Sequence, residues 1–89
     1  MSCSRTLEIT NRRGLHARAS AKFVTLADAL PAKVEVEKDG NKVCGTSIMG
    51  LMMLGAALGD TITIHCEGED CAAALDQLSA LVTERFGED

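Results

Sequence analysis

The segment Gly14-Leu15-His16-Ala17-Arg18 holds the residues whose types and spacing are best suited to chemistry. Gly14 can adopt backbone angles that other residues avoid, so the chain can turn sharply into a helix predicted to begin at Ala17. His16 then falls near the N-cap, where backbone N–H groups lack partners and the helix dipole presents partial positive charge. That end of a helix binds anions, phosphate in particular. The segment therefore predicts an anion site beside an imidazole.

The basic residues around His16 indicate what the imidazole could do. If His16 lies just outside the helix, the long Arg18 side chain can reach the same point, and Arg12 and Arg13 add longer-range attraction. Nearby positive charge disfavours the imidazolium, so a neutral and nucleophilic ring is expected near pH 7. Such a ring can attack phosphorus, and helix amides and a guanidinium can stabilise the resulting phosphohistidine. We interpret His16 as a carrier of phosphate.

Three other roles for His16 have less support. A solvent-facing histidine at a loop–helix junction is the ordinary expectation, because most polar residues face solvent. Metal binding fits poorly, since cationic surroundings repel a metal ion and no second ligand lies nearby in the sequence. Hydrolase chemistry would need a third orienting group, and the sequence identifies none. No metal and no cofactor is therefore predicted.

Composition limits the classes of protein to which this chain can belong. Its 89 residues, 46% of them apolar, predict a single domain over 1–89. No apolar run reaches the roughly 20 residues that cross a bilayer, and no signal peptide is recognisable, so a cytoplasmic protein is predicted. The net charge of −4 and only two phenylalanines argue against nucleic-acid binding. Residues 1–27 are nevertheless basic, with five Lys or Arg residues against one Glu, whereas residues 28–89 are strongly acidic.

The four cysteines show neither a C-x-x-C pair nor the spacing of a zinc site. Without a secretory signal, reduced thiols are predicted, some of them buried as small apolar side chains.

Hydrophobic periodicity predicts the element order β-α-β-β-α-β-α. Strands are expected over 6–10, over 34–37, from Lys42 onward after an Asp39-Gly40 turn, and over 61–67. A first helix is expected from Ala17 to about Leu30, a short one over Ile48–Leu58, and a last one capped by Asp70. This pattern indicates an antiparallel sheet covered by helices on one face.

The helical spacing also predicts which side chains face the core. For the first helix these are Ala17, Ser20, Ala21, Phe23, Val24 and Ala27. For the last helix they are Ala74, Leu75, Leu78, Leu81, Val82 and Phe86. In the last strand, His65 alternates with isoleucines, which predicts a solvent-facing histidine and not a site.

The segment Gly14–Arg18, followed after about thirty residues by Thr46-Ser47-Ile48-Met49-Gly50-Leu51-Met52, resembles the phosphocarrier HPr family of the bacterial phosphoenolpyruvate-dependent phosphotransferase system. The resemblance covers nearly the whole chain. It implies an α+β open-faced β-sandwich, with a four-stranded antiparallel sheet and three helices on one side. A monomer that carries phosphate, and does not turn over a substrate of its own, is expected.

By this resemblance His16 is the phosphorylated residue, and Arg18 and the Ala17 amide bind the phosphate. The family implies phosphorylation at Nδ1 by enzyme I and transfer to a IIA protein or domain. Ala19 stands where the family usually has proline. Alanine is a strong helix former, so the helix is expected to survive with a looser start. Variants of this kind are similar to NPr, the nitrogen-branch carrier, which leaves sugar transport and regulation as alternatives.

Ser47 has a structural and a regulatory interpretation. Thr46 or Ser47 can serve as the N-cap of the short helix. In many HPr proteins the serine of this context is phosphorylated by an ATP-dependent HPr kinase/phosphorylase, and a phosphate at a helix N-terminus is tolerated. Thr46 replaces the lysine that often precedes this serine.

The short helix has more apolar residues than one face can bury. By resemblance Ile48, Met49 and Met52 belong to a docking surface for partner proteins, and methionine suits a surface that meets several partners. Leu51 and Leu54 are predicted to face the core.

Two further classes of function remain as alternatives. One is a regulatory partner protein that acts through Ser47, with His16 incidental. The other is a small RNA-binding or metal-carrying domain, which the acidic charge and the absence of C-x-x-C disfavour.

Overall fold

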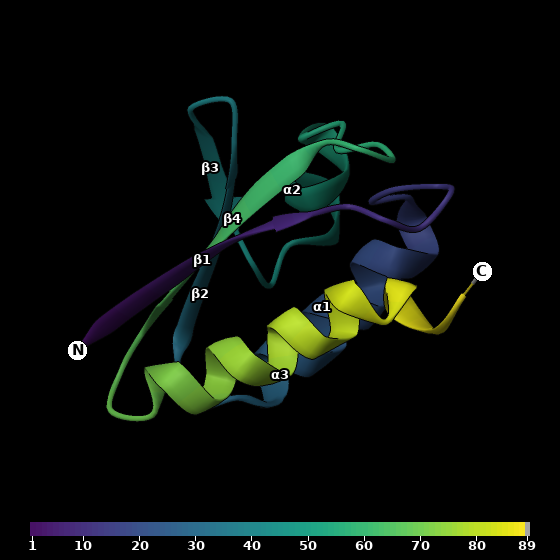
Figure 1. Cartoon of the computed structure of the whole chain (residues 1–89). Coiled ribbons are helices and arrows are strands. Elements are labelled where there is room, and N and C mark those ends of the chain that lie inside the picture. The colour runs from purple at the N-terminus through teal and green to yellow at the C-terminus, as the bar shows by residue number, and fades with distance from the viewer. Residues whose placement is uncertain (89) are drawn as a thin grey trace.

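The fold is a four-stranded antiparallel sheet with helices packed on one of its faces (Figure 1). The structure, a computed structural model, describes residues 1–88. Its elements are β1 (Ser2–Glu8), α1 (Ala17–Ala29), β2 (Lys33–Lys38), β3 (Asn41–Cys44), α2 (Ile48–Met53), β4 (Thr61–Glu67), α3 (Cys71–Thr83) and the 3-10 turn η1 (Arg85–Gly87). The strand order is β1-β4-β2-β3. The predicted fold class and element order are confirmed. In the described chain no helix has the length and apolar character that crossing a bilayer requires.

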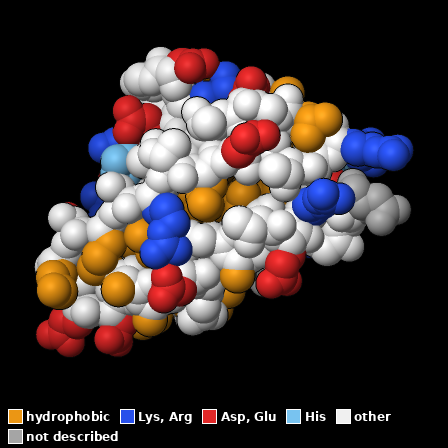
Figure 2. Space-filling model, viewed as in Figure 1, with side chains coloured by type: hydrophobic (Ala, Val, Ile, Leu, Met, Phe, Trp, Pro, Cys, Tyr) orange, Lys and Arg blue, Asp and Glu red, His pale blue; other side chains and the backbone are white. Residues whose placement is uncertain are grey.

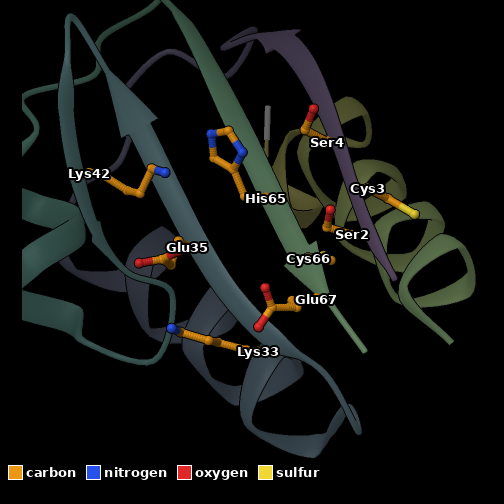
Figure 3. Close-up of a pocket in the computed structure, with 9 residues that line it drawn as sticks. All are labelled: Ser2, Cys3, Ser4, Lys33, Glu35, Lys42, His65, Cys66 and Glu67. Atoms are coloured by element: carbon orange, nitrogen blue, oxygen red, sulfur yellow. The ribbon is translucent and has the colours of Figure 1, made fainter. Parts of the chain in front are cut away.

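Strand β4 shows how the sheet separates its two faces. Ile62, Ile64 and Cys66 are buried and belong to the core, while the alternating Thr63 and His65 are half-buried on the opposite, open face. The Nε2 atom of His65 lies 2.8 Å from a carboxylate oxygen of Glu37 on β2. The open face carries a shallow polar pocket around His65 (Figure 3), and His16 does not line it. His65 therefore lies on the face predicted for it.

Strand β1 begins and ends earlier than predicted. It pairs with β4 over its whole length, from Ser2 opposite Glu67 to Glu8 opposite Thr61, because the antiparallel partner offers hydrogen bonds that periodicity does not reveal. Ile9 lies beyond the strand but is fully buried, and its backbone exchanges hydrogen bonds with the segment before β4.

Helix α1 has the predicted bounds but a shifted buried face. It ends at Ala29, just before Leu30-Pro31, as the proline predicts. Ala17 is exposed and Ala21 and Val24 are only half-buried, which corrects the predicted face. The buried residues are Ala19, Ser20, Phe23 and Ala27. Small residues left the choice of face open, and the bulky Phe23 decides it by entering the core.

Helix α2 is shorter than the predicted Ile48–Leu58 and ends at Met53. Gly55 follows at a φ of +64°, a left-handed conformation that stops a helix. The Oγ atom of Ser47 accepts a hydrogen bond from the Gly50 N–H at 3.0 Å, so the predicted cap is confirmed. Leu51 is fully buried and Leu54 packs half-buried against the core, as predicted.

The end of the chain differs from the prediction in two ways. Asp70 stands at the N-cap of α3, but its side chain makes no capping hydrogen bond. Phe86 is buried as predicted, yet it lies in η1 and not in α3. Helix α3 stops at Thr83 because Arg85 and Phe86 both take positive φ values, which turn the chain back.

The prediction that all cysteines are reduced thiols is wrong for two of them. Cys3 of β1 and Cys71, the first residue of α3, form a disulfide with Cα atoms 5.9 Å apart. Cys44 and Cys66 are free. Sequence spacing could not show this pair because 68 positions separate its members.

Candidate functional site

The loop before α1 is fixed by contacts with the chain after α2. Gly14 has a φ of +62°, and a Cβ built there would lie 2.2 Å from the carbonyl oxygen of Ala56. The next residue, Leu15, donates its N–H to that same oxygen at 2.9 Å. Glycine is therefore required by both the backbone angle and the space. These contacts set the position from which the chain enters α1.

His16 is the N-cap of α1. Its backbone is extended, with φ −75° and ψ −179°, and its carbonyl oxygen accepts the N–H of Ser20 at 2.9 Å. Its side chain makes no capping hydrogen bond. Among the described residues, the N–H groups of Ala17 and Arg18 have no hydrogen-bond partner. The imidazole thus lies beside free helix-opening amides, which can hold an anion.

A carboxylate orients the imidazole. The Nε2 atom of His16 lies 3.1 Å from both Oε1 and Oε2 of Glu88. Both side chains are largely covered, with 17% and 20% of their surface exposed. An ionised carboxylate can only accept hydrogen bonds, so the proton must lie on Nε2. In the neutral ring the lone pair is then on Nδ1.

The end of the chain is anchored so that Glu88 reaches His16. Phe86 is buried, and its carbonyl oxygen accepts a hydrogen bond from Nζ of Lys22 at 2.6 Å. The buried Asn11 donates its side-chain amide to the Glu88 carboxylate at 2.8 Å and to the Gly14 carbonyl at 2.9 Å. The Asn11 hydrogen bond, followed by the contact with His16, lowers the pKa of Glu88 from its ordinary value.

Asn11 also leaves one polar atom without a partner. Its Oδ1 is buried and accepts no hydrogen bond from the described residues. Because both amide hydrogens are used by oxygen acceptors, the orientation of the amide is set by its neighbours. Asn11 therefore acts as a bridge between the loop before α1 and the Glu88 carboxylate.

Arg18 is exposed and makes no hydrogen bond or ion pair with any other described side chain. Arg12 and Arg13 are exposed as well. Figure 2 shows Lys and Arg side chains at several places on the viewed face, among acidic and hydrophobic ones. Arg18 thus follows His16 by two positions in the first turn of α1, and its guanidinium is free to bind a ligand.

Helix α2 packs against α1, and the chain that follows α2 contacts the loop before α1 through the Ala56 carbonyl, so α2 lies near this site. Ile48, Met49, Met52 and Met53, here called the α2 patch, are 40, 71, 42 and 80% exposed. The predicted exposure of the first three is confirmed, and Met53 joins them. Half-buried Ser47 begins this helix, so the capping serine lies at the edge of the α2 patch.

Two residues of the site were not identified from the sequence. Glu88 is 72 positions from His16, and Asn11 was assigned only to a loop. No local pattern distinguishes Glu88 from the other acidic residues of the second half of the chain. The expected all-cationic surroundings of His16 are therefore corrected, since a carboxylate contacts the ring. Within residues 1–88, no three His, Cys, Asp or Glu side chains are arranged to hold a metal ion.

Comparison with known proteins places this site in a family. The family model described as "PTS HPr component phosphorylation site" matches residues 3–84. The chain is 46% identical to the phosphocarrier protein HPr of Cupriavidus necator, over 94% of each chain. It is 40% identical to the phosphocarrier protein NPr of Shewanella violacea, over 94% of this chain and 92% of that one.

A solved structure shows the same fold. The crystal structure of HPr-C-His from Thermoanaerobacter tengcongensis superposes with a TM-score of 0.92 at 41% identity, covering 98% of each chain. Proteins of this family carry phosphoryl groups and are not themselves catalysts. The fold, the loop that holds His16 and the extent of the match lead to one conclusion: this chain belongs to the HPr family of phosphocarrier proteins.

Proposed function

We propose that His16 accepts a phosphoryl group on Nδ1 from phosphorylated enzyme I and passes it to a IIA protein or domain. The observation that supports this most strongly is the contact of Nε2 with Glu88, which leaves the lone pair on Nδ1. The lone pair attacks phosphorus, the Nδ1–P bond forms, and the bond between phosphorus and the donor's nitrogen breaks. The proton on Nε2 stays shared with Glu88 throughout.

The surroundings of Nδ1 suit the phosphorylated state. The free N–H groups of Ala17 and Arg18 can donate to the phosphoryl oxygens, and the helix dipole favours the added negative charge. The unpaired guanidinium of Arg18 can swing to the same oxygens and form a charge-assisted hydrogen bond. Transfer to the acceptor reverses these steps, with phosphorus passing from Nδ1 to the acceptor's nucleophile.

Phosphate incorporation from labelled phosphoenolpyruvate with purified enzyme I tests this proposal. The chain has two histidines, so His16→Ala has a matched control in His65→Ala on the open face. Wild type and H65A should gain acid-labile, base-stable label, and H16A should gain none. Label that persists in H16A, or that disappears in H65A alone, would rule the proposal out.

The identity of the acceptor protein distinguishes a role in sugar transport from a role in nitrogen-branch regulation. Relatives named HPr and NPr both match this chain, so the labelled protein should be offered to a sugar-type and a nitrogen-type IIA protein in parallel. We propose the sugar-type IIA as the acceptor, because HPr relatives match at the higher identity. Faster loss of label to the nitrogen-type protein would assign the chain to the regulatory branch instead.

We also propose that Ser47 is a site of regulatory phosphorylation by an ATP-dependent HPr kinase/phosphorylase. Its hydroxyl is half-buried at the N-terminus of α2, next to the α2 patch. A phosphate there would keep a favourable position at the helix end and add negative charge to the docking surface. Incubation with the kinase and labelled ATP should label wild type and Thr46→Ala but not Ser47→Ala. Equal labelling of S47A would exclude this site.

A further inference from the structure

Three of the four cysteines lie together at one end of the molecule. Cys3 of β1 faces Cys66 of β4 directly in the strand register, and Cys71 opens α3 within disulfide distance of Cys3. Cys3 is half-buried, whereas Cys66 and Cys71 are each 1% exposed. In Figure 3 the Cys3 side chain points away from Ser2 and Ser4, toward the side of the strand on which α3 lies. Cys44 is on β3, at the other edge of the sheet.

We propose that Cys3 and Cys71 form a reversible thiol–disulfide exchange site, closed by a low-molecular-weight disulfide such as oxidised glutathione and opened by thiols. Closing it links the edge strand β1 covalently to α3. The half-buried Cys3 is the residue that an external disulfide reaches first. Cys71 is the resolving residue, and Cys66 takes no part.

The exchange proceeds in two balanced steps. The Cys3 thiolate attacks one sulfur of oxidised glutathione, so a Cys3–glutathione bond forms and one glutathione thiolate leaves and takes up a proton. The Cys71 thiolate then attacks the Cys3 sulfur, the mixed disulfide breaks, and the second glutathione leaves. Two protein thiols are oxidised while one glutathione disulfide is reduced to two thiols.

The environments of Cys66 and Cys71 explain the choice of partner. Cys66 is the last residue but one of β4, where burial raises the pKa of its thiol and favours the protonated form. Cys71 is the first residue of α3, and the structure places its sulfur in a bond with Cys3, with the two Cα atoms 5.9 Å apart. Cys71 is therefore the partner that the geometry offers to Cys3.

Other contacts hold the two cysteines together even when they are reduced. The guanidinium of Arg5 on β1 reaches Asp76 at 2.9 Å and the Ser79 hydroxyl at 3.0 Å, both on α3. These bonds keep α3 on β1, so Cys71 stays within reach of Cys3 and the second step is intramolecular. The bridge lies near the N-terminus, whereas Glu88 lies at the other end of α3 (Figure 1), so closure is expected to leave phosphoryl acceptance unchanged.

The test equilibrates the whole chain in glutathione buffers of increasing oxidation, followed by alkylation, peptide mapping by mass spectrometry and thermal unfolding. Oxidised wild type should lose two of its four alkylated thiols and yield one Cys3–Cys71 linked peptide. Cys66→Ser and Cys44→Ser should keep that bridge, and Cys3→Ser and Cys71→Ser should lose it. Because the bridge spans 68 positions, Tm should rise by about 10 °C or more on oxidation of wild type and stay constant in C3S.

Each alternative outcome overturns the proposal. A linked peptide that joins Cys3 to Cys66 would show that the strand neighbour is the partner. Four alkylated thiols in oxidising buffer would show that the pair does not exchange. Equal Tm values for oxidised and reduced wild type would show that the bridge does not stabilise the contact between β1 and α3. If C3S proves unstable when reduced, C71S provides the same comparison.

Discussion

Glu88 contacts one nitrogen of His16, Nε2, and leaves Nδ1 for the proposed phosphoryl transfer. Its carboxylate contacts Nε2 and is itself held by the Asn11 amide, so three side chains form one connected hydrogen-bond network. This resembles the general arrangement in which a nucleophile or base is oriented by a further group. Loss of Glu88 should therefore disturb the orientation of the His16 ring, while His16 itself stays in place at the start of α1.

The lowered pKa of Glu88 predicts a pH-dependent contribution to stability. The folded protein favours the ionised carboxylate, so Glu88 contributes stability that is fully present above about its ordinary pKa of 4.5 and is lost as the pH falls through its lower folded value. Urea unfolding should show that Glu88→Gln is less stable than wild type at pH 7. The difference should shrink as the pH falls to about 3.

Glu84→Gln is the matched control, because Glu84 is exposed and makes no side-chain contact with His16 or Asn11. Its difference from wild type should be small at both pH values. A constant gap between wild type and E88Q over this pH range would contradict the role of the carboxylate charge.

The positions of His16 at a helix start and of Ser47 as a helix cap could be predicted from the sequence because local signals mark both. A glycine before a helix start identifies His16, and a hydroxyl before an apolar run identifies Ser47 as a cap. Glu88 could not be predicted, because its contact with His16 depends on the path of the whole chain through α3 and η1. The same is true of the pairing of Cys3 with Cys71.

The connection between α2 and β4 is the element-scale support of the site. It provides the Ala56 carbonyl that holds Leu15 and leaves no space for a side chain at Gly14. If α2 had continued to Leu58 as predicted, Ala56 would have been inside the helix, and its carbonyl would not have been free to hold Leu15. Periodicity located the apolar residues of this segment, and Gly55 with its positive φ determined where the helix stops.

Gly14→Ala should destabilise the protein more than Gly55→Ala does. Both glycines have nearly the same φ, +62° and +64°, so both substitutions incur the left-handed strain of about 1 kcal/mol. Only at Gly14 does a Cβ meet backbone atoms, which should add about 1–3 kcal/mol for the displaced connection. The free energy of unfolding in urea measures both, and equal losses would contradict the steric argument.

The cap of α2 can be tested in the same way. Ser47→Ala removes the acceptor for the Gly50 N–H and should cost about 1 kcal/mol of unfolding free energy. Ser47→Asp retains an acceptor and adds charge at the helix N-terminus, so it should recover most of that loss. The same urea measurement distinguishes them, and S47D as unstable as S47A would show that the hydroxyl contributes in another way.

At the scale of the whole molecule, charge and apolar surface are concentrated around one end of α1. Arg12, Arg13 and Arg18 are exposed and lie within four positions of His16 in the sequence, although the chain as a whole has a net charge of −4. The α2 patch is carried by the helix that packs against α1. This combination suits brief association, because charge raises the encounter rate and a small apolar surface gives limited affinity.

Met49→Glu should weaken phosphoryl transfer from enzyme I without unfolding the protein. Met49 is 71% exposed, so its replacement costs little in the free chain but places an unpaired charge in the contact with a partner. The KM for this chain as substrate should rise about tenfold or more, with kcat less affected. Ala73 is exposed on α3, so Ala73→Glu adds the same charge away from the α2 patch and should behave as wild type. Equal KM values for M49E and A73E would place the docking surface away from Met49.

The path that brings Glu88 to His16 also sets an order of events during synthesis. A ribosome delivers His16 long before residue 88, and domains acquire their contacts as the chain emerges. While α3 and η1 are still missing, the imidazole has neither its carboxylate nor the buried Phe86 that positions it. A nascent chain therefore displays His16, the proposed phosphate acceptor, without its orientation, and on this proposal phosphoryl acceptance is acquired only when the distal segment has folded.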